Sequence, residues 1–432
     1  MNRIELFNKL IVLIQKYSIP YAIVGRTEEY PTNIGSDIDI VIPRNRISDF
    51  HRMIWEIEDE NTKVVQMFQH EIVAFYYVVF HFDGNERIYI QPDVCTDYYR
   101  KGRLLLTADY LLQGYREATQ GGFNVLSSEK EFIYYLLKKI DKRKLSKDQF
   151  GHIRYSYLEN RDAAKTEASA FWMDDDSSII FQSLDKNDYE LMLSNLERLQ
   201  EGIHSSHRKR MSDIVKDIYL KFSRIIKPTG FVIAVMGPDG SGKTTVMNQF
   251  KEDIEPAFRR IQQFHLFPIP QTGKEQVNEN PHGKKKRGFI LSFMKLIYFI
   301  LIYTLGYLKL VAPKKIRSTL TIFDRYYDDI LVDPIRYRNG TLPFVVKIFR
   351  LFIPKPELWF FLDCPTDVIQ ARKSEVSPEE TERQRKTYLR LAETKKNSII
   401  LNTNRDVKEI SIEACRCICD ILNKRAIKRY KR

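Results

Sequence analysis

One segment constrains the fold of this chain more than any other, the run FVIAVMGPDGSGKTT at residues 231–245. Its apolar start has the length and residue types of a buried strand, and a helical pattern follows the last threonine. Between them lies the spacing GxxxxGK[ST], in which backbone N–H groups turn inward around an anion at a helix N-terminus. A strand, a glycine-rich loop and a helix in this order predict an α/β fold with a parallel sheet.

This loop predicts a nucleoside triphosphate site, with ATP as the donor and Mg²⁺ as its metal ion. The Lys243 ammonium is placed to reach the β- and γ-phosphates, and the Thr244 hydroxyl to bind Mg²⁺. A glycine-rich turn that binds nothing is the alternative, which a match this complete does not favour. The predicted nucleotide contacts in the loop are Gly237, Pro238, Asp239, Gly240, Ser241, Gly242, Lys243, Thr244 and Thr245.

Two later strand patterns, 320–323 and 358–362, should lie in the same sheet as 231–236, with 398–401 as a fourth strand. The first of them delivers Asp324 and Arg325 at its carboxyl end, where parallel sheets place ligands. Arg325 is predicted to pair with an acceptor phosphate or with the group in transfer. Asp324 is predicted to orient the acceptor or to bind Mg²⁺ through water. A structural ion pair between the two is the alternative.

Three arginines follow the 358–362 strand, and we predict that they close over the phosphates as a lid. Arg372 comes ten residues after that strand, and Arg383 and Arg385 stand in a charged helical segment. Lid arginines exclude water and so favour transfer over hydrolysis. Because the segment is charged throughout, solvated helix residues are the alternative for each of them.

Residues 230–425 resemble the thymidylate kinase family of nucleotide kinases. Four elements match in order: the loop with an acidic third residue (Asp239), the Asp324-Arg325-Tyr326 triplet, the Leu-Asp-x-Pro strand end with the later Arg372, and the arginine-bearing segment. The resemblance implies a P-loop kinase in which Asp239 contacts a hydroxyl of the acceptor sugar. The predicted catalytic residues are Asp239, Lys243, Asp324, Arg325 and Arg372.

The stretch from residue 249 to 321 departs from this family, which builds much of its thymidylate pocket there. The run DDILVDPIRYR, with Asp329, Asp333, Arg336 and Arg338, adds candidate acceptor contacts. It resembles thymidylate-kinase-like proteins associated with surface polysaccharide synthesis. We therefore expect phosphoryl transfer to a small acceptor, which is a nucleotide, a sugar or a glycan-related intermediate. A P-loop ATPase coupled to a binding event is an alternative from another class.

The N-terminal part carries a second constellation. Asp37 and Asp39 alternate along a short strand and so share one face, and Asp93 follows a later strand pattern. With the glycine Gly25, this arrangement resembles the polymerase-β-like nucleotidyltransferases, in which a glycine contacts a triphosphate and three carboxylates bind metal. Nucleotidyl transfer with Mg²⁺ at these aspartates is thus an alternative function. Because Arg26 departs from the family pattern and Pro92 precedes Asp93, an inactive or substrate-binding version of the fold is also open. Solvated, purely structural aspartates in an unrelated α/β domain are a further alternative.

These patterns predict three segments: a nucleotidyltransferase-like α/β domain at 1–105, a helical segment at 106–227, and a P-loop parallel-sheet domain at 228–432. The start of the chain has an amphipathic helical pattern without the cleavage site of a signal peptide. The five cysteines fit neither a disulfide framework nor zinc spacings, which favours a reducing compartment. We expect a cytoplasmic protein.

The formal net charge is +13, and basic residues cluster at 284–287, 314–317 and 424–432. Such clusters suit a phosphorylated substrate, anionic lipid or nucleic acid, and a solvated surface is the alternative. We expect a small-molecule partner rather than nucleic acid, whereas the oligomeric state is not predictable. The apolar run 288–307 lies between two basic clusters, so 284–317 is a candidate for peripheral membrane contact. We expect it mainly to be a packed helix of the kinase domain.

Overall fold

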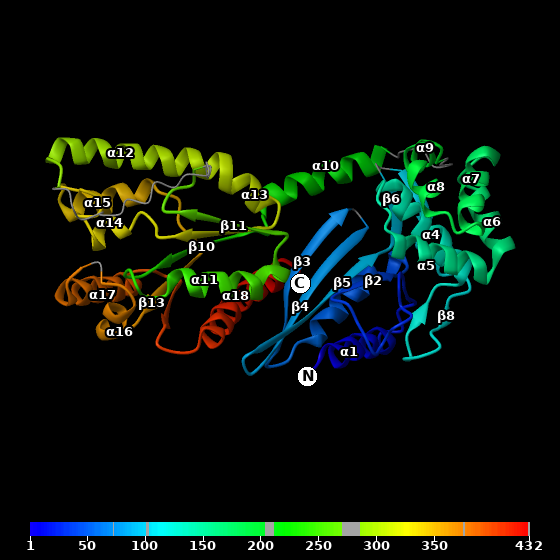
Figure 1. Cartoon of the computed structure of the whole chain (residues 1–432), viewed down its shortest axis with the longest axis horizontal. Coiled ribbons are helices and arrows are strands. Elements are labelled where there is room, and N and C mark those ends of the chain that lie inside the picture. Colours follow the sequence, from blue (N-terminus) through cyan, green and yellow to red (C-terminus); the bar gives the residue numbers. More distant parts are fainter. Residues whose placement is uncertain (72, 101–102, 204–210, 270–285, 375, 431–432) are drawn as a thin grey trace. The chain divides into compact units, whose positions relative to one another are not determined.

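Short apolar runs become strands in the computed structural model of the protein, which describes residues 1–71, 73–100, 103–203, 211–269, 286–374 and 376–430. Within these residues the chain divides into two units, each with its own sheet. Figure 1 labels the elements of both. Unit 1 holds Met1–Asp83, Ile88–Lys221 and the residues from Leu422 onward, and unit 2 holds Gly84–Arg87 and Phe222–Ile421.

Unit 2 is built around a five-stranded parallel sheet with the order β11-β12-β10-β13-β14. The strands are β10 (Phe231–Met236), β11 (Arg260–His265), β12 (Thr319–Asp324), β13 (Leu358–Asp363) and β14 (Ser398–Asn402). Every residue of β10 is buried, as expected for a central strand that is covered on both faces. Because β12 and β13 flank β10, the sheet has a switch point at β10, where ligands bind at the carboxyl ends. The predicted α/β fold class is confirmed.

Helices cover both faces of this sheet, with α12 on one side and α11 on the other (Figure 1). The helices of unit 2 are α11 (Lys243–Ile254), α12 (Phe289–Gly306), α13 (Ala312–Ile316), α14 (Asp329–Val332), α15 (Pro343–Phe349), α16 (Thr366–Arg372) and α17 (Pro378–Glu393). Shorter helical turns are η3 (Glu255–Ala257), η4 (Tyr307–Val311) and η5 (Arg350–Phe352). Two helices, α10 (Met211–Ile226) and α18 (Val407–Tyr430), contain residues of both units.

The expectation of a packed helix at 288–307 holds for one face only. Four residues of α12 are buried at the spacing of a single helical face: Ser292, Leu296, Phe299 and Tyr303. Among the described residues, one helix, Phe289–Ile316, is long and apolar enough to cross a membrane by length and composition. Only 22% of its most apolar 18-residue window is buried, so the expectation was wrong for the opposite face. Lys284 and Lys285 of the basic cluster lie outside the described residues.

Unit 1 contains a mixed seven-stranded sheet with the order β3-β4-β5-β2-β1-β9-β8, and a separate pair, β6-β7. The strands are β1 (Ala22–Ile23), β2 (Asp37–Val41), β3 (Thr62–Glu71), β4 (Ala74–Asp83), β5 (Glu86–Cys95), β6 (Asp97–Arg100), β7 (Arg103–Thr107), β8 (Arg116–Glu117) and β9 (Asn124–Val125). Side-chain alternation along β2 buries Ile38 and Ile40, and it directs Asp37 and Asp39 to the opposite face.

The helices of the predicted middle segment share a core with this sheet. Ala22 and Val41 of the strands belong to the same apolar cluster as Phe132 and Leu136 of α4. The end of α18 also joins unit 1, since Ala426 lies in a core cluster with residues of α1. The helical elements are α1 (Arg3–Lys16), η1 (Arg44–Arg46), α2 (Ile47–Met53), η2 (Ile54–Ile57), α3 (Ala108–Leu111), α4 (Ser128–Asp141), α5 (Lys147–Glu159), α6 (Arg161–Ser169), α7 (Asp174–Asp185), α8 (Tyr189–Ser194) and α9 (Leu196–Glu201).

Candidate functional site

The phosphate-binding loop runs from the end of β10 into the first turn of α11. Gly240 has a φ of 83°, a backbone conformation that residues with a Cβ atom rarely adopt. A Cβ atom at Gly237 would lie 2.8 Å from the Ser241 Oγ and 2.9 Å from the Leu362 carbonyl oxygen. One at Gly240 would lie 2.9 Å from the Ile369 carbonyl oxygen. The loop therefore needs glycine at both positions to follow this path at the carboxyl edge of the sheet.

Lys243 begins α11, and its side chain is buried. Its Nζ donates hydrogen bonds to the carbonyl oxygens of Gly237, at 2.9 Å, and Pro238, at 2.7 Å. Burial, followed by the positive charge of Arg325, lowers the pKa of Lys243 to about 8. A desolvated ammonium at a helix N-terminus within a glycine-rich loop is an arrangement that binds oligophosphates.

Two arginines that follow strand β12 donate hydrogen bonds to Asp239 of the loop. Arg325 Nη2 and Arg336 Nη1 each donate to one of its carboxylate oxygens. Arg325 follows β12 with a φ of 71°, and only 3% of it is exposed. The structure thus brings together three residues that the sequence predicts on the donor and acceptor sides.

A second carboxylate, Asp329, fixes the other side of the Arg325 guanidinium. Asp329 is fully buried and accepts from Arg325 Nη1 at 2.7 Å and from the Tyr337 hydroxyl at 2.6 Å. The Tyr388 hydroxyl donates to its other oxygen. Complete hydrogen bonding compensates the cost of burying this charge. Sequence reasoning missed the part of both tyrosines, because no local spacing marks side chains that meet only in the folded chain.

Asp324 has a partner other than Arg325, which argues against a simple ion pair between neighbours. Its Oδ2 lies 3.5 Å from His265 Nδ1 of β11. Burial raises the pKa of Asp324, but the hydrogen bond with His265 and the charge of Lys243 outweigh burial and keep this pKa below its ordinary value. Asp324 is therefore an anion at neutral pH.

The donor set of the loop fits a Mg²⁺-bound triphosphate. Within the described part of the chain, Asp324 Oδ1 and Ser241 Oγ are buried without a hydrogen-bond partner, and such atoms call for a ligand. Mg²⁺ is usually held by one or two protein oxygens together with substrate phosphates. The described residues contain no group of three or more His, Cys, Asp or Glu side chains that could hold a metal ion. Thr244, exposed in the first turn of α11, is the second predicted ligand.

The three predicted lid arginines lie in different surroundings. Arg372 is exposed beside the loop, since its Nη1 would be 3.7 Å from a Cβ atom at Gly242. Arg385 makes a two-pronged pair with Asp363 at the end of β13, with its Nε 2.6 Å from Oδ1.

Arg383 of α17 is bonded away from the loop. Its guanidinium donates twice to Glu380 of the same helix and once to the carbonyl oxygen of Val332, at 2.8 Å. Its nucleotide contact stays a prediction, as do those of Arg372 and Arg385. Geometry favours Arg372 most, because its Nη1 lies beside Gly242 of the loop, although its guanidinium also donates to the Thr403 carbonyl oxygen at 3.3 Å.

Two hydrogen bonds connect the segment that follows Arg336 with α12. The residues that follow Arg336 pass along that helix, where Lys295 Nζ donates to the Tyr337 carbonyl oxygen at 2.6 Å. The Gly340 amide donates to Ser292 Oγ at 2.8 Å. The segment that holds Asp239 is therefore tied to α12 at two points.

Unit 1 brings the predicted aspartates together. β2 and β5 pair in parallel with Asp39 opposite Asp93 and with Asp37 opposite Gln91. The Tyr76 hydroxyl donates to Asp37 Oδ1 at 3.1 Å. Burial, followed by the negative charge of Asp39, raises the pKa of Asp93 to about 6. Neighbouring carboxylates with a shifted pKa are typical of functional sites.

A lysine that the sequence did not indicate lies among these carboxylates. Lys138 of α4 donates from Nζ to Asp39 Oδ2 at 2.9 Å. The two residues are 99 positions apart, so no motif could have paired them. The Lys138 ammonium pairs with Asp39, and the described residues contain no group of three metal-binding side chains placed to hold an ion. The metal site at Asp37, Asp39 and Asp93 stays a prediction.

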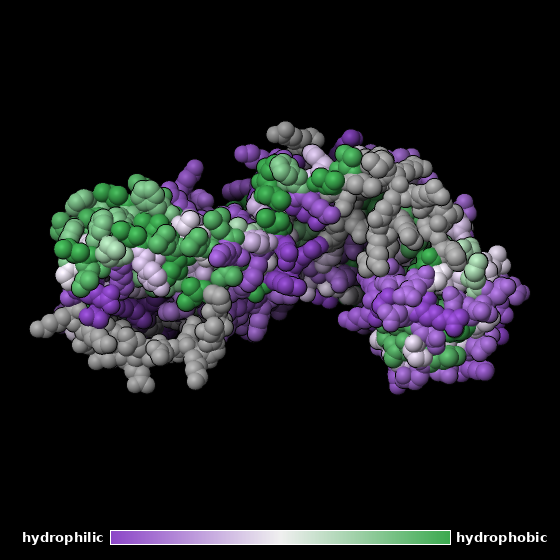
Figure 2. All heavy atoms as spheres, turned by 90° about the horizontal axis from the view of Figure 1, so that it is seen from above, coloured by the Kyte–Doolittle hydropathy of each residue, from purple (hydrophilic) through white to green (hydrophobic). Residues whose placement is uncertain are grey.

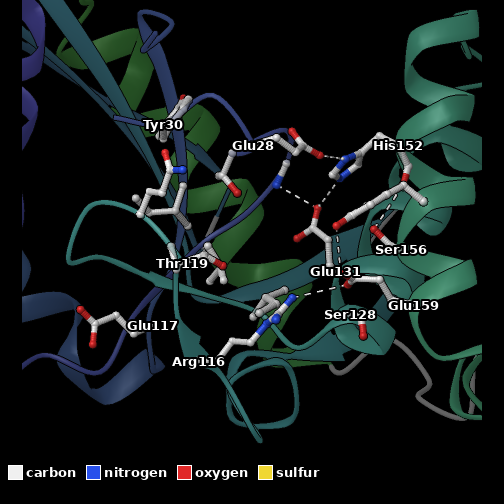
Figure 3. A pocket seen from close by; sticks show the side chains of 18 residues that line it. Glu28, Tyr30, Arg116, Glu117, Thr119, Ser128, Glu131, His152, Ser156 and Glu159 are labelled. Atoms are coloured by element: carbon white, nitrogen blue, oxygen red, sulfur yellow. Dashed lines mark hydrogen bonds and ion pairs between the residues drawn. The ribbon is translucent and has the colours of Figure 1, made fainter. Parts of the chain in front are cut away.

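A cavity of about 280 Å³ lies beside Gly25 in the same unit. Figure 3 shows His152 between two carboxylates, with Nδ1 2.9 Å from Glu28 Oε1 and Nε2 2.9 Å from Glu131 Oε1. The latter oxygen also accepts from the Gly25 amide at 2.9 Å. Burial lowers the pKa of His152, but hydrogen bonding to Glu131 and the two negative charges outweigh burial. The pKa of His152 therefore lies above its ordinary value. The glycine of the predicted triphosphate contact thus borders a polar cavity.

Comparison with known proteins concerns the second half of the chain. The family described as Thymidylate kinase matches residues 235–413. Residues 235–413 are thymidylate kinase-like. A solved thymidylate kinase from Ehrlichia chaffeensis is similar to part of this chain. The match covers 44% of this chain and 98% of that kinase, with 16% sequence identity and a TM-score of 0.32. No curated protein matches. The family match and the sheet topology indicate a P-loop kinase, whereas the nucleotidyltransferase resemblance of residues 1–105 stays a prediction.

The raised pKa of Asp93 predicts a pH-dependent stability. Its folded-state pKa of about 6 exceeds the unfolded value of about 3.9, so ionisation costs more in the folded protein. Asp93 should therefore contribute a loss of stability to the parent as the pH rises through this window, and Asp93→Asn should lack this contribution. Relative to the parent, the variant should gain roughly 2–3 kcal/mol between about pH 4 and pH 8, as measured by denaturant unfolding. Asp148→Asn, at an exposed site, is the control. Equal pH dependence of Asp93→Asn and the parent would contradict the shift.

Proposed function

We propose that the thymidylate kinase-like part transfers a phosphoryl group from ATP to a small acceptor with the help of Mg²⁺. The observation that carries this proposal is the attachment of the loop residue Asp239 to both Arg325 and Arg336. A hydrolytic switch can use an arginine at the phosphates, but it does not need a loop carboxylate paired with arginines on the acceptor side. The family match over 235–413 supports the same conclusion.

The donor side would work by charge stabilisation. Phosphoryl transfer asks the protein mainly for positioning and for neutralisation of the transferred group. Lys243 and the loop amides would contact the β- and γ-phosphates. Thr244 and Asp324 would hold Mg²⁺, which when bound neutralises negative charge on the phosphates. Arg372 lies beside the loop and would cover the group in transfer.

The acceptor would be bound by Asp239 together with Arg325 and Arg336, which donate to its carboxylate. The Asp239 carboxylate can accept a hydrogen bond from an acceptor hydroxyl and so orient it toward the donor. The buried Arg325 and the partly exposed Arg336 can pair with an anionic group of the acceptor. Asp329 would act as a positioning residue, because it holds Arg325 through a hydrogen bond and touches no substrate itself.

The acceptor is proposed to be a sugar or glycan-related intermediate rather than thymidylate. Donor machinery is shared among kinases of one fold, whereas the acceptor is chosen by particular pocket contacts. The family match spans residues 249–321, but the sequence indicates no pocket residues of the family there, and this chain has the apolar helix α12 in that stretch. The DPIRYR run contributes Arg336 to the cluster instead.

A second candidate is nucleotidyl transfer or nucleotide binding by unit 1. The observation that favours it is the register that sets Asp39 opposite Asp93, two residues from Asp37, with the raised pKa of Asp93. Carboxylates clustered at strand ends can hold Mg²⁺ for attack on a triphosphate. The cavity beside Gly25 offers room for a substrate of modest size.

Lys243→Met should strongly lower the rate of transfer and leave the fold intact. The substitution removes a charge that stabilises the transferred phosphate, and the desolvated ammonium contributes little to folding. Turnover measured with labelled ATP should fall about a hundredfold to a thousandfold, with an unchanged circular dichroism spectrum. Lys251→Met, on the same helix but outside the loop, should keep full activity. A folded Lys243→Met protein with parental turnover would refute the donor assignment.

Thymidylate should be a poor acceptor. In a screen that separates transfer from hydrolysis, its kcat/KM should stay below about 10⁴ M⁻¹s⁻¹, and a sugar or sugar-phosphate acceptor should exceed it. Asp239→Asn should lower transfer to the preferred acceptor more than it lowers ATP hydrolysis. A higher efficiency with thymidylate would make the protein an ordinary nucleotide kinase.

Unit 1 should add a second nucleotide site to the full chain. Calorimetric titration with Mg²⁺ and nucleoside triphosphates should give two sites in the parent. It should give one site in the double variant Asp37→Asn/Asp39→Asn, because the metal-binding carboxylates are removed. Asp148→Asn should keep both sites. If parent and double variant bind the same number of nucleotides, the metal-site hypothesis is wrong.

A further inference from the structure

α12 has two apolar faces, and only one of them is covered. The stripe that contains Leu296 and Phe299 lies in the core of unit 2 with residues of β10 and β12. The residues between these positions point away from the core, and each is at least half exposed. They are Phe289, Ile290, Leu291, Met294, Tyr298, Leu301 and Leu305, with Leu308 continuing the face into η4. A helix that exposes so many large apolar side chains calls for a partner surface.

The exposed face extends beyond α12 onto α15 and η5. The rings of Phe293 and Phe349 meet with centroids 5.1 Å apart, which joins the two helices side by side. Figure 2 shows apolar side chains gathered over this end of unit 2. The exposed apolar residues of this second part are Leu342, Phe344, Ile348, Leu351 and Phe352. We call the residues of both parts together the α12–α15 face.

The two stretches of sequence that carry this face hold basic residues and no acidic ones. The sequence contains no Asp or Glu between Lys286 and Phe323, and none between Gly340 and Pro356. The exposed basic residues in these stretches are Lys286, Arg287, Lys309, Lys314, Arg317, Lys347 and Lys355. Exposed apolar side chains on stretches whose charged residues are lysine and arginine match the chemistry of an anionic lipid surface.

We propose that the α12–α15 face docks onto an anionic bilayer, with α12 lying in the plane of the interface. The helix does not cross the bilayer, because its other face is part of the protein core and Lys295 Nζ is bonded to the Tyr337 carbonyl oxygen. A second copy of the chain is a poorer occupant, since two faces with basic borders repel each other. The proposal concerns binding alone and does not depend on the phosphoryl-transfer reaction.

Vesicle sedimentation of the full-length protein tests the docking. The parent should bind vesicles of two parts phosphatidylcholine to one part phosphatidylglycerol, and should bind pure phosphatidylcholine at least about tenfold more weakly. Leu291→Asp/Leu351→Asp should lower binding to the anionic vesicles at least about tenfold, since charge is moved into the apolar interface. Val12→Asp in unit 1, at an exposed and solitary apolar residue, should bind like the parent.

Tyr298→Trp supplies a reading that does not depend on loss of binding. Its fluorescence should shift to the blue with anionic vesicles and should be quenched by lipids brominated on the acyl chain. Melting curves establish that each variant is folded. Absence of vesicle binding by the parent, or parental binding by the folded double variant, would overturn the proposal. So would a dimer in sedimentation velocity that the double variant abolishes, when neither protein binds lipid.

Discussion

The Arg325 guanidinium is the interaction on which the candidate kinase site depends. It is almost fully buried, at a residue with left-handed backbone geometry, and it bridges the loop carboxylate of Asp239 and the buried carboxylate of Asp329. Removing one partner of such a buried pair costs about 3–5 kcal/mol, because the other charge is left uncompensated. The arginine therefore cannot be exchanged without disturbing the loop, the end of β12 and α17 together. The positive charge of Arg325 thus fixes the loop residue Asp239 relative to Asp329.

Local chemistry explains what the sequence predicted well. The strand, loop and helix around Lys243 were predictable because the pattern specifies backbone geometry within nine consecutive residues. Four of the five strands of unit 2 were evident as apolar runs. β11 was missed because, as an edge strand, it carries Arg260, Gln262 and Gln263 where central strands carry apolar residues.

Partners that are distant in the sequence explain what could not be predicted. Lys138 reaches Asp39, and Tyr388 reaches Asp329, through folding alone. The same reason applies to the middle helices, which the sequence pattern marked only as a helical segment at 106–227. They share a core with the sheet of unit 1, because the strands near Ala22 supply apolar side chains that α4 must cover. Burial patterns show which face of a helix is covered, but they do not show what covers it.

The two hydrogen bonds that tie α12 to the segment after Arg336 have a thermodynamic consequence. Lys295 donates a hydrogen bond to the backbone of that segment, and Ser292 accepts one from it. The Arg336 side chain donates to Asp239. A displacement of α12 that moved this segment would therefore alter the contact between Arg336 and Asp239. Linkage would make such a coupling reciprocal: a ligand that moved the segment through Asp239 would change, by the same factor, the affinity of whatever binds the outer face of α12.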